Sequence, residues 1–118
     1  MIFNSLEDGL AFVEKFCSQY NIEEEKKYKL KLITEELLTN ILKYSDASEY
    51  EFILKKEESI YLYIAYTSLC FDMQIAKPKS QRIEDIEYGG LGLFLVKKMA
   101  SAFHHNYKEG RNIFEVLL

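Results

Sequence analysis

The longest helical pattern in this chain closes with the stretch Thr34-Glu35-Glu36-Leu37-Leu38-Thr39-Asn40-Ile41-Leu42-Lys43-Tyr44. From about residue 23 to residue 44, apolar side chains recur every three or four positions, and the segment contains neither glycine nor proline. This spacing predicts a long amphipathic helix. Its apolar stripe consists of Leu30, Ile33, Leu37, Leu38, Ile41 and Leu42.

The patterns on either side of this helix predict the remaining elements. Ser5, followed three residues later by Asp8, favours the start of a first helix that ends near Tyr20-Asn21. Alternating apolar residues predict strands over 50–54 and 60–65, joined by a polar turn at 55–59. Residues 70–75 extend the second of these strands or begin another.

A polar stretch around Pro78 separates these strands from the last third of the chain. A third helix is expected to start just past Gly92, with Lys97, Lys98 and His104 in its last turn. Strands over 105–108 and 113–118 then flank a turn at 109–111. This order of helices and strands predicts one α+β domain over 1–118, a two-layer sandwich with helices on one face of a mixed, mostly antiparallel sheet.

Composition and charge narrow the function classes. The 118 residues are 48% hydrophobic and 29% charged, which is typical of a globular domain. The net charge of −4 disfavours a nucleic-acid partner. No apolar run approaches the roughly 20 residues that a membrane span needs. Without a secretory leader at the start or a Cys-x-x-Cys pair, Cys17 and Cys70 are expected to be reduced core thiols of a cytoplasmic protein.

Two groups of residues could carry chemistry. Glu36 and Asn40 are four residues apart, on one face of the long helix. An amide oxygen suits Mg²⁺, and a nearby carboxylate can accept a proton, although a solvated polar face is the simpler interpretation. Gly89, Gly90 and Gly92 precede the third helix, whose free N–H groups could bind a phosphate; a flexible hinge is the alternative.

Taken together, these groups resemble a known family. The stretch 34–44 resembles the N box of the GHKL-type ATPases, and Gly89-Gly90-Leu91-Gly92-Leu93-Phe94-Leu95-Val96 looks like their second glycine-rich box. The sequence of the second box is most similar to that of bacterial anti-sigma factor serine kinases. The resemblance implies a Bergerat fold that holds ATP and Mg²⁺ between the long helix and the glycine loop.

The resemblance also assigns roles to single residues. Glu36 matches the catalytic base that activates a serine hydroxyl, and Asn40 matches the Mg²⁺ ligand. The implied contacts to the bound nucleotide come from Asn40, Lys43, Tyr66, Gly89, Gly90, Gly92 and Leu93. Residues 77–87 match the ATP lid. The implied partners are a sigma factor and its antagonist (anti-anti-sigma) protein, with no direct contact to nucleic acid or membrane, and a homodimer is compatible with the group.

One box of the family departs from the pattern. The first glycine-rich box of this branch reads Asp-x-Gly-x-x-Phe-Asp, and only Phe71-Asp72 fits it here. Tyr66 stands where the adenine-binding Asp is expected, and Ser68 stands where the Gly is expected. Three accounts are open: weak ATP binding in a rearranged pocket, a different phosphate ligand, or a non-catalytic protein-binding module that has lost adenine recognition.

Overall fold

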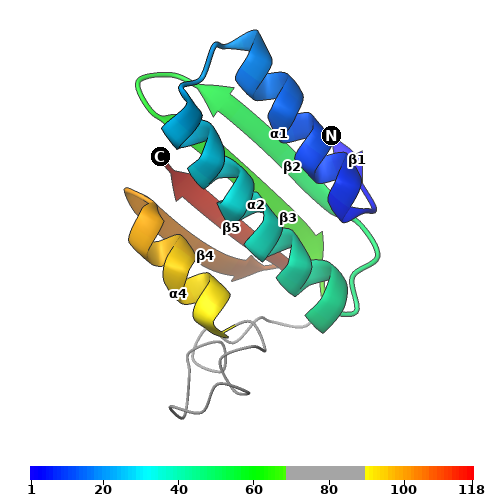
Figure 1. The fold of residues 1–118 in the computed structure, drawn as a ribbon. Coiled ribbons are helices and arrows are strands. Elements are labelled where there is room, and N and C mark those ends of the chain that lie inside the picture. The colour runs from blue at the N-terminus through cyan, green and yellow to red at the C-terminus, as the bar shows by residue number, and fades with distance from the viewer. Residues whose placement is uncertain (69–89) are drawn as a thin grey trace.

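The computed structural model describes residues 1–68 and 90–118. Three helices and five strands lie in these two ranges (Figure 1). In chain order they are β1 (Ile2–Phe3), α1 (Leu6–Gln19), α2 (Glu24–Tyr44), β2 (Tyr50–Lys56), β3 (Ile60–Thr67), α4 (Gly90–Met99), β4 (Ala102–Lys108) and β5 (Arg111–Leu117).

The strands form a single sheet in the order β1-β2-β3-β5-β4, and each described pair of neighbours is antiparallel. All three helices lie on the same face of this sheet (Figure 1). The expected α+β fold with two layers is therefore confirmed. None of the described helices combines the length and the apolar character needed to cross a bilayer.

The first two helices follow their sequence signals closely. Ser5 caps α1, because its hydroxyl oxygen accepts a hydrogen bond of 3.1 Å from the backbone N–H of Asp8. The apolar stripe of α2 packs into the core, as its spacing predicts, with Leu42 at its end only partly buried. Cys17 is buried and reduced, as expected. β1, only two residues long, was not predicted, because so short a segment carries no alternation to read.

Two expectations about α4 are wrong. The helix begins at Gly90 instead of just past Gly92, and it ends at Met99, so His104 lies in β4 and not in the last turn of the helix. The chain turns into the sheet directly after the helix, where Ser101 N–H donates to the carbonyl oxygen of Leu117 at 2.8 Å. Cys70, the possible strand at 70–75 and the polar stretch 77–87 lie outside the described residues.

The hairpin between β4 and β5 was predicted, but both strands begin earlier than expected, at Ala102 and Arg111 instead of at residues 105 and 113. Glu109 and Gly110 both have positive φ, 53° and 77°, so they form the two-residue turn whose twist suits antiparallel strands. Arg111, placed in the turn by its sequence context, instead begins β5 and pairs with Thr67 on β3. The ends of β3 and β4 and the start of β5 therefore meet at one end of the sheet.

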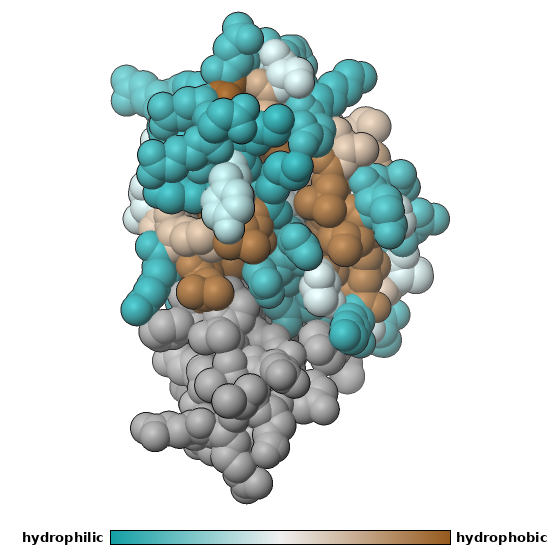
Figure 2. All heavy atoms as spheres, viewed as in Figure 1, coloured by the Kyte–Doolittle hydropathy of each residue, from teal (hydrophilic) through white to brown (hydrophobic). Residues whose placement is uncertain are grey.

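The core lies between the sheet and the helices. The helix-facing side chains of β3, at alternate positions from Ile60 to Tyr66, are buried, whereas Tyr61 and Tyr63 on the opposite face are partly exposed. On the outer surface of the helices, hydrophilic side chains alternate with separate apolar areas (Figure 2). Such a mixed surface is ordinary for a soluble domain and does not by itself mark a binding face.

Candidate functional site

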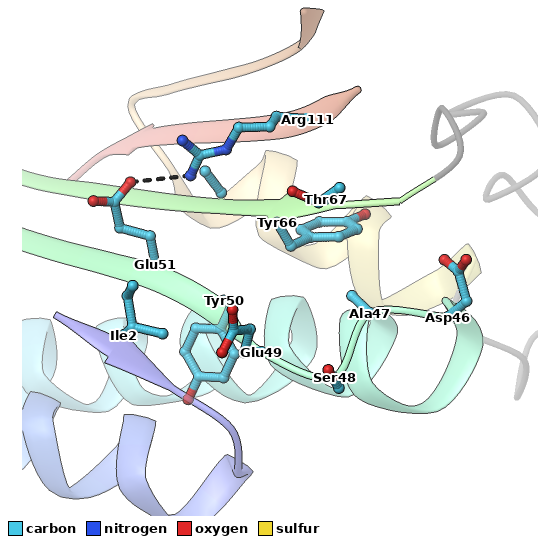
Figure 3. A pocket seen from close by; sticks show the side chains of 11 residues that line it. Ile2, Asp46, Ala47, Ser48, Glu49, Tyr50, Glu51, Tyr66, Thr67 and Arg111 are labelled. Atoms are coloured by element: carbon cyan, nitrogen blue, oxygen red, sulfur yellow. Dashed lines mark hydrogen bonds and ion pairs between the residues drawn. The ribbon is translucent and has the colours of Figure 1, made fainter. Parts of the chain in front are cut away.

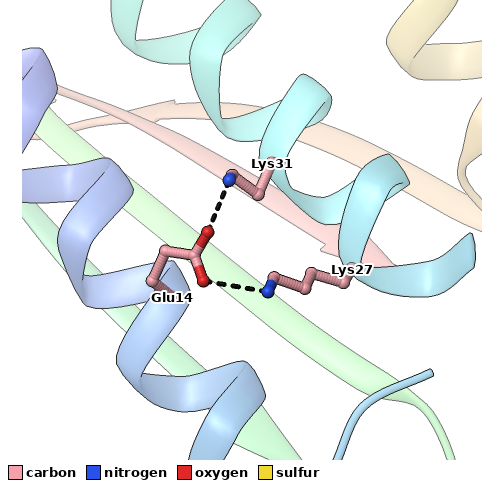
Figure 4. A network of polar contacts seen from close by, with 3 residues as sticks. All are labelled: Glu14, Lys27 and Lys31. Atoms are coloured by element: carbon pink, nitrogen blue, oxygen red, sulfur yellow. Dashed lines mark hydrogen bonds and ion pairs between the residues drawn. The ribbon is translucent and has the colours of Figure 1, made fainter. Parts of the chain in front are cut away.

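The two sides of α2 have different neighbours. On one side, α2 is tied to α1, because Lys27 and Lys31 both contact the carboxylate of Glu14, at 3.0 and 2.5 Å (Figure 4). Glu36 follows Lys27 by nine residues, and Asn40 follows Lys31 by nine. Nine residues make two and a half turns of an α-helix, which places a residue on the opposite side. Glu36 and Asn40 therefore point away from α1.

The side of α2 that carries Glu36 and Asn40 is the side on which α4 packs (Figure 1). The two helices run in opposite directions, so the start of α4 lies at the end of the molecule where α2 ends. Gly90, Gly92 and Leu93 fall in the first turn of α4, and Gly89 lies outside the described residues. The first-turn N–H groups have no partner within an α-helix, which makes this end suited to an anion.

Glu36 has the properties of a proton acceptor. Its side chain is partly buried, and this burial raises the pKa of its carboxyl above the ordinary value. The negative charge of neighbouring Glu35 acts in the same direction. A carboxylate with a raised pKa holds an accepted proton more readily. The chemistry of Glu36 thus fits the base role that its position implies, which stays a prediction.

Asn40 has its amide fixed by the helix itself. Its side-chain nitrogen donates a hydrogen bond of 2.8 Å to the carbonyl oxygen of Glu36. This bond commits the nitrogen to the helix and leaves the amide oxygen as the donor for a cation. Mg²⁺ is commonly held by few protein oxygens together with waters and substrate phosphates, so a single amide oxygen fits such a site. Lys43 is exposed, one turn further along α2.

Tyr66 lies inside the core. It is 3% exposed, and its ring stacks on Phe114 of β5 with centroids 6.1 Å apart and an angle of 15° between planes. His105 of β4 stacks on the same phenylalanine, at 4.7 Å and 24°. The backbone of Tyr66 pairs with Asn112, whose side chain is fully buried and contacts His105. A ring held in this way occupies space rather than offering an open stacking surface.

Ser68 joins two loops at the end of β3. Its hydroxyl donates to a carboxylate oxygen of Asp46, in the loop after α2, and its backbone N–H donates to the carbonyl oxygen of Gly110 at 3.2 Å. The glycine expected at this position could make only the second of these bonds. Ser68 therefore fastens the end of β3 to the loop after the N-box segment.

A cavity that the sequence did not predict lies beside Asp46 and Thr67 (Figure 3). It has a volume of about 430 Å³. It lies beside the start of β2, where β3 continues past its last pair with β2 and still pairs with β5. Arg111 and Glu51 form an ion pair of 3.0 Å at its wall. Neither Glu36 nor Asn40 lines it. Its lining residues are Ile2, Asp46, Ala47, Ser48, Glu49, Tyr50, Glu51, Ala65, Tyr66, Thr67 and Arg111.

Comparison with protein families gives a match over almost the whole chain. A family model described as a histidine kinase-like ATPase domain matches residues 4–116. No individual curated protein matches the sequence. The family match covers both α2, with Glu36 and Asn40, and the start of α4. The chain therefore belongs to the histidine kinase-like ATPase domain family.

Proposed function

We propose that this chain is an ATP- and Mg²⁺-binding regulatory domain that works as a serine kinase, similar to the anti-sigma factor kinases. Family membership implies ATP binding, usually with Mg²⁺. The observation that carries the proposal is the contact between α2 and α4, on the side of α2 that bears Glu36 and Asn40. The substrate is a serine of an antagonist protein, and the regulated partner is a sigma factor.

In this proposal the start of α4 binds the phosphates. The N–H groups of Gly90, Gly92 and Leu93 lie in its first turn, and glycine lets a phosphate approach the backbone closely. Lys43, in the last turn of α2, supplies a positive charge at the same end of the molecule. Together these groups offset the negative charge of a triphosphate.

Asn40 and Glu36 have separate tasks. Asn40 holds Mg²⁺ through its amide oxygen, and Mg-ATP supplies the phosphoryl group that is transferred. Glu36 accepts the proton of the substrate serine as the bond from the serine oxygen to the γ-phosphorus forms and the bond from that phosphorus to the bridging oxygen breaks. ADP leaves with the electron pair of the broken bond, and Glu36 later releases its proton to water.

Thermal unfolding with Mg-ADP tests the binding step. A Kd of about 100 µM or tighter should stabilise the protein by about 1 kcal/mol or more at millimolar ligand. Asn40→Ala should remove most of the shift, whereas Thr39→Ala, the adjacent substitution on α2, should retain it. A midpoint that does not move at several millimolar Mg-ADP would refute the proposal.

A second function is favoured by Tyr66 and Ser68. The buried ring and the Ser68–Asp46 hydrogen bond occupy the two positions that the family uses for adenine. In this alternative the fold is a non-catalytic module that binds the sigma factor or its antagonist. Tyr66→Asp combined with Ser68→Gly distinguishes the two functions. Nucleotide binding that appears only in the double variant would identify a module, and equal binding in both proteins would support the kinase.

A further inference from the structure

We infer that this site recognises the magnesium triphosphate part of its ligand and does not select the base. Nucleoside triphosphates with different bases, and inorganic tripolyphosphate, should therefore bind with similar affinity. The inference rests on the proposed function, since it concerns the same site between α2 and α4. It goes beyond that proposal in stating that the adenine base contributes little to the binding affinity.

The space over one end of the sheet is filled by rings. Tyr66 on β3, Phe114 on β5 and His105 on β4 stand on three neighbouring strands, and the first and last both stack on Phe114. Tyr66 and Phe114 are 3% and 2% exposed. Buried and stacked in this way, the rings of Tyr66 and Phe114 leave almost no exposed surface on which a purine could stack.

The side chains on this face of the sheet also offer few hydrogen bonds to a base. On the helix-facing side of the described parts of β3, β5 and β4, no position carries a carboxylate. The amide on this side belongs to Asn112, which is fully buried, and its oxygen lies 2.9 Å from Nε2 of His105. Asn112 is thus engaged within the sheet. Losing one charge-assisted hydrogen bond to a base removes about one to two decades of selectivity.

The end of β3 that carries Tyr66 is held on both sides of the strand. Tyr66 and Thr67 pair with Asn112 and Arg111 on β5, and Ser68 donates from its backbone to Gly110 and from its hydroxyl to Asp46. These contacts fix the backbone of β3 at Tyr66, while the ring itself is held by its burial and by its stacking on Phe114. The ring is therefore packed into the core in this structure.

The groups assigned to the triphosphate lie on a different layer. Glu36, Asn40 and Lys43 are on α2, and the first-turn N–H groups belong to α4. A ligand can therefore keep its phosphate and metal contacts while its base stays outside the core.

A ligand panel on the full chain tests the inference. ATP, GTP, CTP and inorganic tripolyphosphate are titrated calorimetrically with saturating Mg²⁺, and their Kd values should agree within about threefold. The affinities for all four ligands should decrease by a similar factor in Asn40→Ala, which would show that binding occurs at the proposed site. ATP that binds at least about tenfold tighter than all three others would overturn the inference and leave the proposed function standing.

Two further outcomes are decisive. If no ligand binds, the proposed function fails and this inference fails with it. If all bind but Asn40→Ala binds them equally well, the binding is unspecific and the inference is overturned. The double variant with Tyr66→Asp and Ser68→Gly, if circular dichroism shows it folded, should gain a preference for ATP. Tyr63→Asp, on the opposite face of β3, is the matched control and should gain none.

Discussion

The side-chain amide of Asn40 donates a hydrogen bond to the carbonyl oxygen of Glu36, 2.8 Å away and one turn earlier in α2. The amide of Asn40 is thus linked to the backbone of Glu36 and not to its carboxylate. The carboxylate of Glu36 remains available as a base, and the amide oxygen of Asn40 remains available as a metal ligand. This arrangement allows the two roles to be separated by mutation.

Asn40→Ala should weaken Mg²⁺-dependent nucleotide binding. Groups that only support a metal ligand already contribute about 10–100-fold to metal affinity, so removing the ligand should cost at least roughly tenfold. Nucleotide binding measured in EDTA should change much less. Titration calorimetry with and without Mg²⁺ checks both statements. Equal losses in the two conditions would assign Asn40 a structural role.

Glu36→Gln should abolish phosphoryl transfer and leave binding intact. Glutamine keeps the shape of the side chain but cannot accept a proton, and general-base catalysis commonly contributes about 10²–10⁴-fold. Glu35→Gln removes the same charge from the neighbouring exposed position and serves as the control. Transfer of radiolabelled phosphate from ATP to a serine of the antagonist protein is the measurement. Activity retained in Glu36→Gln would exclude the base role.

The raised pKa of Glu36 predicts a pH-dependent cost to stability. Because burial raises this pKa in the folded state, the native protein binds more protons at this site than the unfolded chain does. Stability should therefore fall as pH rises from the ordinary value of 4.5 through the raised pKa. As pH rises through that range, the urea midpoint of Glu36→Gln should increase relative to the urea midpoint of the natural protein. A difference that stays constant with pH would contradict the assignment.

Sequence patterns predicted the first two helices well and the bounds of the third helix poorly. The apolar spacing of α2 and the Ser5 cap are local signals, so their helices could be located to within a residue or two. The start of α4 was misplaced because glycine is a poor helix former, so the pattern put Gly90 before the helix, whereas the structure has Gly90 as its first residue. His104 was misplaced because the end of the helix depends on a long-range contact. The backbone N–H of Ser101 donates to the carbonyl oxygen of Leu117, which joins the chain to the sheet directly after α4.

The position of Tyr66 shows what sequence could not provide. Its replacement of the expected aspartate was visible, but the motif left open whether the ring stacks on a base or fills the core. That choice depends on Phe114 and His105, about 40 to 50 residues away in sequence and brought beside it by strand pairing. The cavity beside Asp46 was missed for the same reason, because the register of β2 against β3 creates it.

Gly9 should not tolerate a side chain, even though it lies inside a helix. It is buried where α1 crosses α2 and β2, and a Cβ atom there would lie 2.5 Å from the hydroxyl oxygen of Tyr50 and closer still to Leu38 Cδ1. Tyr50 cannot move away cheaply, because its hydroxyl donates to the carbonyl oxygen of Ser5 at 2.6 Å. Alanine is favoured over glycine in a helix by about 1 kcal/mol, so propensity alone predicts stabilisation.

In Gly9→Ala, the cost of overpacking the core therefore opposes the gain in helix propensity. Overpacking in a tight core costs about 1–3 kcal/mol, which should outweigh the gain and lower the midpoint of thermal unfolding by several degrees. Ser18→Ala, an exposed substitution on the same helix, should leave the midpoint nearly unchanged. Adding Tyr50→Phe to Gly9→Ala removes the hydroxyl that the new methyl group meets, so the double variant should lose less than the sum of the two single losses. Strictly additive losses would show that Leu38, and not Tyr50, sets the limit at this crossing.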